Sequence, residues 1–309
     1  MFTSIFKKST PINYSLIVLS TLVFYFLYHF RVGLSIPGWM GMAEKVGDLV
    51  LIFASLFLAN FIVKKNTLTK DSSFTIYFYL VFLLFFPKIW GDIRLLFANF
   101  FILLTLRRLV SLQTLKSPKE KIFDACLWVF VASLFQFWAV LFVLLVYISI
   151  VFHVSRDFRN WLIPFVAFFI VGMIFSAYSL AIVPGSLTHY MQQETINYQL
   201  DYFQNQNENI AFSMFVVAVL FFFIPYIVTI TNKPLNLQAS HKKIAFALVF
   251  GGILFAISTP KSNELLVFMI FPMAVMASNM VEYMQSKLQR ELVLILTLAC
   301  GLFAFFSQL

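Results

Sequence analysis

The chain has 309 residues, of which 61% are hydrophobic and 11% are charged, and its mean hydropathy is +0.90. Soluble globular proteins are about 45 to 50% apolar and about 25% charged, so a water-soluble fold could not bury this much apolar surface. The formal net charge is +9, but the basic residues are spread through short linkers and form no patch typical of nucleic-acid binding. We therefore expect an integral membrane protein with lipid around it and no nucleic-acid partner.

The apolar runs predict an all-α polytopic bundle, because a helix satisfies every backbone polar group within one segment of a bilayer. A crossing needs about 20 apolar residues, and this length predicts a single membrane domain over 1–309 with about eleven spans, within a range of about nine to twelve. The predicted spans are 14–30, 48–63, 74–87, 94–106, 123–135, 138–153, 161–183, 210–231, 244–258, 265–281 and 292–306.

Two pairs of these spans are short, and each pair, 74–106 and 123–153, is also open to interpretation as one bent or re-entrant segment. Separate helices agree better with the charges of the linkers. They place 17 of the 22 Lys and Arg residues in the linkers on the side of the N-terminus. Basic linkers face the cytoplasm, so we predict a cytoplasmic N-terminus.

The first outer linker contains two candidate catalytic carboxylates. Glu44 and Asp48 are four residues apart and would share one helix face. Paired carboxylates perform general acid or base catalysis or bind a divalent metal, and this spacing makes a metal the one cofactor that the sequence leaves open. The alternative is that both are solvated acids at a helix start. Arg31, just after the first span, is a candidate ligand for a lipid phosphate.

The turn over 87–94 places Lys88, Asp92 and Arg94 close together at the outer surface. One interpretation is that the two cations bind a lipid phosphate while Asp92 acts as a base, since Arg and Lys pair well with phosphate oxygens. The other is an interfacial salt bridge beside a Trp anchor. A second outer turn, 258–264, carries Lys261 and Glu264, either as a capped helix start or as part of one outer pocket with the first turn.

The longest hydrophilic stretch, 184–209, is predicted to lie on the outer face with one or two interfacial helices. It is either a substrate loop or a docking site for a membrane or periplasmic protein. Its candidate substrate-binding residues are His189, Tyr190, Glu194, Tyr198, Asp201 and Tyr202.

The four histidines have no zinc spacing, and the chain contains no P-loop, dinucleotide-binding turn or nucleophile elbow. No cofactor is identified. Ionisable residues stand near the predicted span boundaries, which counts against an ion-coupled transporter.

The segment 90–150, with the sequences Gly91-Asp92-Ile93-Arg94 and Leu106-Arg107-Arg108-Leu109, resembles an uncharacterised family of bacterial multi-pass inner-membrane proteins. The overall layout is also similar to the polyprenyl-phosphate-dependent glycosyltransferases of the GT-C fold. That resemblance implies an acidic catalytic residue in the first outer linker, where the acids of this chain are Glu44 and Asp48.

Three functions are therefore expected in this order. The first is handling of a polyprenyl phosphate or similar membrane lipid in cell-envelope glycan or lipid assembly, with glycosyl transfer as its enzymatic form. The second is a non-enzymatic scaffold or accessory subunit, and the third is a transporter or flippase.

Overall fold

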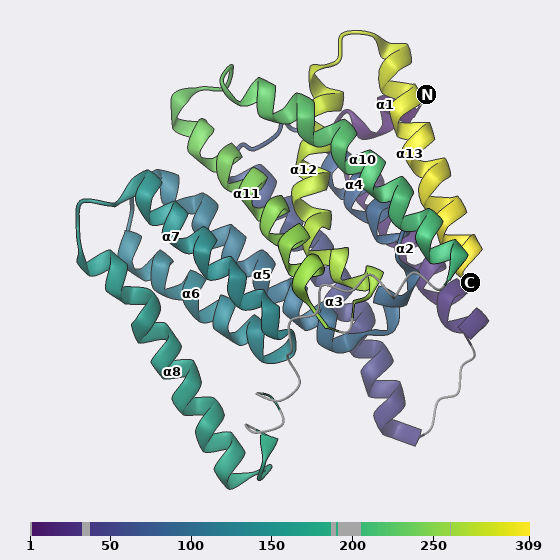
Figure 1. The fold of residues 1–309 in the computed structure, drawn as a ribbon. Helices are drawn as coiled ribbons and strands as arrows, with labels where there is room; N and C mark the ends of the chain where they lie inside the picture. Colours follow the sequence, from purple (N-terminus) through teal and green to yellow (C-terminus); the bar gives the residue numbers. More distant parts are fainter. Residues whose placement is uncertain (1, 33–37, 187–189, 191–204, 260) are drawn as a thin grey trace.

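The computed structural model describes residues 2–32, 38–186, 190, 205–259 and 261–309, and all regular structure in these ranges is helical (Figure 1). The α-helices are α1 (Phe2–Phe6), α2 (Pro11–Val32), α3 (Gly38–Lys65), α4 (Phe74–Leu83), α5 (Ile93–Ser111), α6 (Pro118–Phe135), α7 (Phe142–His153), α8 (Arg159–Ala181), α10 (Gln206–Ile230), α11 (Leu235–Ile257), α12 (Val267–Tyr283) and α13 (Lys287–Gln308). The short 3-10 helices are η1 (Pro87–Gly91), η2 (Leu112–Thr114), η3 (Phe137–Leu141) and η4 (Asn263–Leu266).

Each predicted span falls on one of the helices α2 to α8 or α10 to α13, which confirms the all-α prediction. Among the described residues, eight helical segments are long and apolar enough to cross a membrane, and two apolar segments are shorter, Phe74–Leu83 and Phe137–His153. The arrangement is compatible with a multi-pass membrane protein. The number of crossings stays a prediction.

The two pairs of short spans are separate helices. A 3-10 turn, η1, joins α4 to α5, and another, η3, joins α6 to α7. Pro87 stands at the start of η1, where its fixed φ and missing N–H are tolerated. The Asp92 carboxylate then accepts a hydrogen bond from Leu95 N and caps α5.

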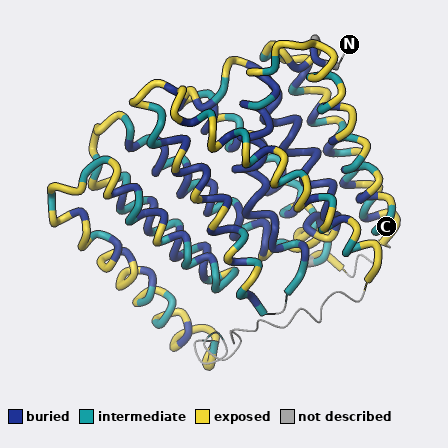
Figure 2. The backbone as a smooth tube through the Cα atoms, turned by 45° about the horizontal axis from the view of Figure 1, so that its top comes forward, coloured by how far each residue is buried: buried dark blue, intermediate teal, exposed yellow. Residues whose placement is uncertain are grey.

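The centre of the bundle is formed by α4 and α12, which pack against each other. All ten residues of α4 are buried, and Figure 2 shows the buried backbone in the middle of the molecule with exposed positions around it. Phe78 and Phe82 of α4 make edge-to-face ring contacts with Phe222 of α10. Because lipid is as apolar as these side chains, close packing and ring geometry stabilise this core more than removal from water does.

Helix α8 lies at one edge of the bundle, against α6 and α7 (Figure 1). Phe165, Phe169, Ile174 and Leu180 on it are exposed. An apolar helix face without a protein neighbour is what a lipid-facing helix presents.

The alternation of the helices gathers the basic linkers at one end of the bundle. We call this the basic end; it comprises α1 and the linkers 66–73, 112–117, 154–158, 231–234 and 284–286. Ser73 N donates to Phe6 O, and the Thr3 hydroxyl donates to Glu291, so α1 packs against this end of the bundle. The opposite end carries η1, η3 and the linker 258–263. The cytoplasmic location of the basic end stays a prediction.

Candidate functional site

Asp48 is buried inside the bundle near the opposite end. We predicted a span beginning at Asp48, but α3 begins at Gly38, so Asp48 lies well inside the helix. Only 2% of the residue is exposed, and its Oδ1 atom has no hydrogen-bond partner among the described residues. Glu44, one turn earlier, is exposed. The two candidate carboxylates therefore have different surroundings, and only Glu44 fits the interpretation as a solvated acid.

Tyr25 of α2 lies within electrostatic range of Asp48. The Tyr25 and His29 rings lie 4.3 Å apart, and the Tyr25 hydroxyl donates to Lys45 O over 2.7 Å. His29 is also buried, and its Nε2 atom has no hydrogen-bond partner among the described residues. A buried polar atom without a partner costs about 1–3 kcal/mol, and such groups call for a functional explanation. We call Tyr25, Tyr28, His29 and Asp48 the Asp48 site.

Residues of both predicted outer turns, 87–94 and 258–264, lie near this site. Tyr28 lies within electrostatic range of Asp48, Asp92, Lys88 and Glu264. Lys88 Nζ forms an ion pair of 2.7 Å with Glu208 of α10, and this hydrogen-bonded partner raises the pKa of Lys88. Among the described residues, no three His, Cys, Asp or Glu side chains lie together as metal ligands would.

The remaining candidate residues are more scattered. Arg31 at the end of α2 and Arg94 in the first turn of α5 are exposed, and Lys261 is half-buried in the linker after α11. Within the predicted substrate loop, His189, Glu194, Tyr198, Asp201 and Tyr202 lie outside the described residues.

Tyr190 is the predicted loop residue that the structure describes. Its hydroxyl donates to Ser133 O over 2.8 Å, and its ring lies near those of Phe137 and Phe175. The end of α6, η3 and α8 therefore hold this side chain in the bundle.

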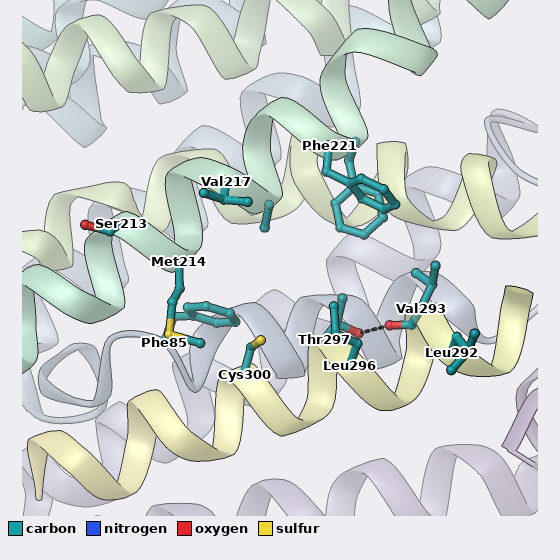
Figure 3. A pocket seen from close by; sticks show the side chains of 12 residues that line it. Phe85, Ser213, Met214, Val217, Phe221, Leu292, Val293, Leu296, Thr297 and Cys300 are labelled. Carbon is teal, nitrogen blue, oxygen red and sulfur yellow. Dashed lines mark hydrogen bonds between the residues drawn. The ribbon is translucent and has the colours of Figure 1, made fainter.

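A groove of about 540 Å³ lies between α10 and α13, with Phe85 at one side (Figure 3). Its lining is almost wholly apolar. The Ser213 hydroxyl donates to Asn209 O, and the Thr297 hydroxyl donates to Val293 O and Leu294 O, so both lining hydroxyls are satisfied within their own helices. The groove therefore suits a hydrocarbon chain. The lining residues are Phe85, Ser213, Met214, Val217, Ala218, Phe221, Phe222, Leu292, Val293, Leu296, Thr297 and Cys300.

Polar contacts border the groove toward the opposite end of the bundle. The Asn207 side-chain amide donates to Ser307 O over 2.6 Å, and that of Gln308 donates to Phe85 O over 2.9 Å. The Lys88 and Glu208 pair belongs to the same region, since Lys88 follows Phe85 by one turn. This layer is where an apolar chain in the groove would meet a polar headgroup.

Ionisable side chains are also buried at the basic end, where the sequence had suggested only signals of topology. Lys243 is fully buried and its Nζ donates to Leu109 O. We predicted a span beginning at Ile244, but α11 begins at Leu235 and carries His241 and Lys243 into the bundle. Lys233 and Glu282 are each 9% exposed. Lys243 and Glu282 adjoin apolar helical runs, which is a signal in the sequence, whereas Lys233 lies in the linker 231–234 and has no such signal.

No curated protein and no solved structure matches the chain significantly. A family model described as a family of unknown function, DUF6427, matches residues 1–309. The resemblance to an uncharacterised family is confirmed at that level, whereas the bacterial origin and the likeness to glycosyltransferases stay predictions. Because this match spans residues 1–309, the chain belongs to the DUF6427 family.

Proposed function

We propose that this chain binds a long-chain anionic lipid of the polyprenyl-phosphate type and handles it in cell-envelope glycan or lipid assembly. The observation that carries this proposal is the apolar groove between α10 and α13, which ends at a polar layer. Its volume of about 540 Å³ is in the range of ligand pockets. Its lining has no spare hydrogen-bond donor to offer a polar molecule, so a hydrocarbon chain is the ligand that it suits.

The headgroup would lie at the end of the groove where Lys88 stands. The Lys88 side chain is 54% exposed, so its ammonium can exchange Glu208 for a phosphate oxygen. Arg94 and Lys261 supply further positive charge at this end of the bundle. The basic linkers at the other end support a cytoplasmic N-terminus, and with that orientation the Lys88 region would lie on the outer face of a bacterial inner membrane.

Asp48 is the residue that we assign as general acid or base of a glycosyl transfer at this face. It is buried, one of its oxygens has no partner among the described residues, and Tyr25, whose ring contacts that of His29, lies within electrostatic range of it. A carboxylate held in this way has the surroundings of catalytic carboxylates rather than of structural ones. Asp92 by contrast caps α5, and Glu44 is exposed.

Filling the groove should release the lipid. In Ala218→Phe, a ring would occupy the space between α10 and α13, and we expect lipid retained after purification in mild detergent to fall about tenfold. Native mass spectrometry of the purified protein measures the retained lipid. The matched control is Val228→Phe, on the same helix and 67% exposed but not in the groove lining. Equal retention by both variants, or a wild type that carries no long-chain lipid, would contradict the proposal.

Removing the headgroup cations is a separate test. We expect the triple variant Lys88→Ala, Arg94→Ala and Lys261→Ala to change envelope glycans and to accumulate lipid-linked intermediates in cells that depend on this chain. Each exposed ion pair contributes only about 0–1 kcal/mol, so the triple variant should still fold. Unchanged glycans and intermediates in a folded triple variant would rule out these cations as the phosphate site.

A further inference from the structure

A second polar cavity lies at the basic end, far along the bundle from the Asp48 site. It has a volume of about 200 Å³ and is bordered by the linker 66–70, the linker 231–234, the start of α11 and the end of α12. Lys233, His241, Asn279, Glu282 and Tyr283 are among its lining residues. None of them belongs to the groove or to the site of the proposed function.

Lys233 is the central cation of this cavity. Its Nζ donates to Asn279 Oδ1 over 2.6 Å and to Tyr283 Oη over 3.0 Å, and it stands 4.3 Å from the centre of the Tyr283 ring. Both of these residues are uncharged. Among the described residues, no carboxylate lies within ion-pair distance of Lys233 Nζ, although the residue is only 9% exposed. An ammonium has three donors, so the two neutral partners leave one donor unused, and the Glu282 carboxylate, although within electrostatic range, stands beyond ion-pair distance.

Glu282 compensates the Lys233 charge only from a distance, and its two oxygens accept hydrogen bonds from other groups. The Ser72 hydroxyl donates to Oε1 over 2.5 Å, and Lys70 N donates to Oε2 over 2.9 Å. Glu282 thus connects the linker 66–73 to α12 through two hydrogen bonds. A second ammonium, Lys70 Nζ, stands 5.1 Å from the Tyr283 ring centre, so two cations flank the same ring.

His241 adds a further donor on the wall of the cavity. Its Nδ1 atom shares a hydrogen bond of 2.7 Å with the Tyr226 hydroxyl, and both residues are buried. Where Tyr226 donates, the neutral imidazole carries its proton on Nε2 and donates from there. Thr67, also on the wall, has a φ of 51°, a left-handed conformation that is costly for a β-branched residue.

We propose that this cavity binds a phosphate group, carried either by an anionic lipid or by a soluble molecule. Lys233 is the principal ligand, with Lys70 and the His241 imidazole as further donors. The cavity is about the size of a phosphate with a small substituent and a few waters, since one water takes about 30 Å³ of liquid volume. A bound phosphate would give the buried Lys233 ammonium a directly contacting negative partner, which Glu282 does not provide.

The test uses the purified full chain in a maltoside detergent, which contributes no phosphate. Thermal unfolding is measured with inorganic phosphate against chloride of equal ionic strength, and separately with short-chain phosphatidic acid against diacylglycerol. We expect a saturable rise of the unfolding temperature with a phosphate-bearing probe. In Lys233→Met, the apparent affinity should fall at least about tenfold, as expected when a charge-assisted bond is lost.

The matched control is Lys242→Met, an exposed lysine one residue after His241. The proposal is supported if Lys242→Met keeps its affinity for the phosphate-bearing probe and Lys233→Met loses it. An equal loss in both variants would indicate nonspecific charge attraction and would overturn the proposal. If Lys233→Met does not fold, Lys70→Ala at an exposed position takes its place, with the same two outcomes. Stabilisation by phosphatidic acid alone identifies a lipid headgroup, and stabilisation by both probes identifies the phosphate group itself. No stabilisation of the wild type by either probe overturns the proposal.

Discussion

Valine in place of Gly251 should prevent stable packing of α11 on α12. A Cβ atom at Gly251 would lie 2.8 Å from Met269 Cγ, and 3.3 Å from both Met269 N and Phe268 C. Two of these three neighbours are backbone atoms that cannot move aside without shifting α12. Overpacking typically costs about 1–3 kcal/mol, and a β-branched residue adds two methyl groups to the clash. We expect a lower unfolding temperature in detergent and a smaller monodisperse fraction on size-exclusion chromatography.

The neighbouring glycine provides the control. A Cβ atom at Gly252 would meet only the Met269 side chain, at 3.8 and 3.9 Å, which is ordinary contact. Alanine there removes the entropic cost of glycine within a helix, and Gly252→Ala should therefore raise stability by about 0.5–1 kcal/mol. If Gly251→Val unfolded at the wild-type temperature, that result would contradict the close packing of α11 on α12 at Gly251.

Asparagine in place of Asp48 should abolish function and leave the fold intact. The two side chains have nearly the same shape, but the amide cannot take up or release the proton. General acid–base catalysis contributes about 10²- to 10⁴-fold, so a loss of that size is expected in the proposed transfer reaction. Stability should stay the same or rise, because a buried carboxylate without a full set of partners is replaced by a neutral group. Complementation of a deletion strain, together with the unfolding temperature, measures both effects.

Glu44→Gln is the matched control, because Glu44 lies one turn earlier on α3 and is exposed. It should complement the deletion fully. Two results would count against Asp48 as a catalytic residue. One is complementation by Asp48→Asn, and the other is a large fall in its unfolding temperature, which would indicate a structural role.

The helices were predictable because lipid imposes a simple rule on long apolar segments. Helix starts were harder, since polar residues continue a helix when they face protein rather than lipid. Thus α3 extends back to Gly38 past the buried Asp48, and α11 extends back to Leu235 past the buried Lys243. In both cases, a charge that resembled a boundary marker lies inside a helix.

The sites were less predictable for the same reason. Lys233 and His241 lie in or near a basic linker, and their partners Asn279 and Tyr226 come from other helices, so no local pattern indicates their burial. The groove likewise lies between α10 and α13, which are distant in sequence, so no local motif predicts it. Lys88 and Asp92 were found from their own turn, but the pairing of Lys88 with Glu208 requires a contact across 120 positions of the chain.

Helix α4 has a consequence for the order in which the protein assembles in the membrane. Its ten residues are too few to cross a bilayer, and they are enclosed on every side by protein. Its Tyr77 hydroxyl donates to Leu294 O of α13, and the preceding Ser72 bonds Glu282 of α12. During synthesis these partners emerge long after α4 itself. We therefore expect α4 to reach its final packing only after α12 and α13 have been synthesised.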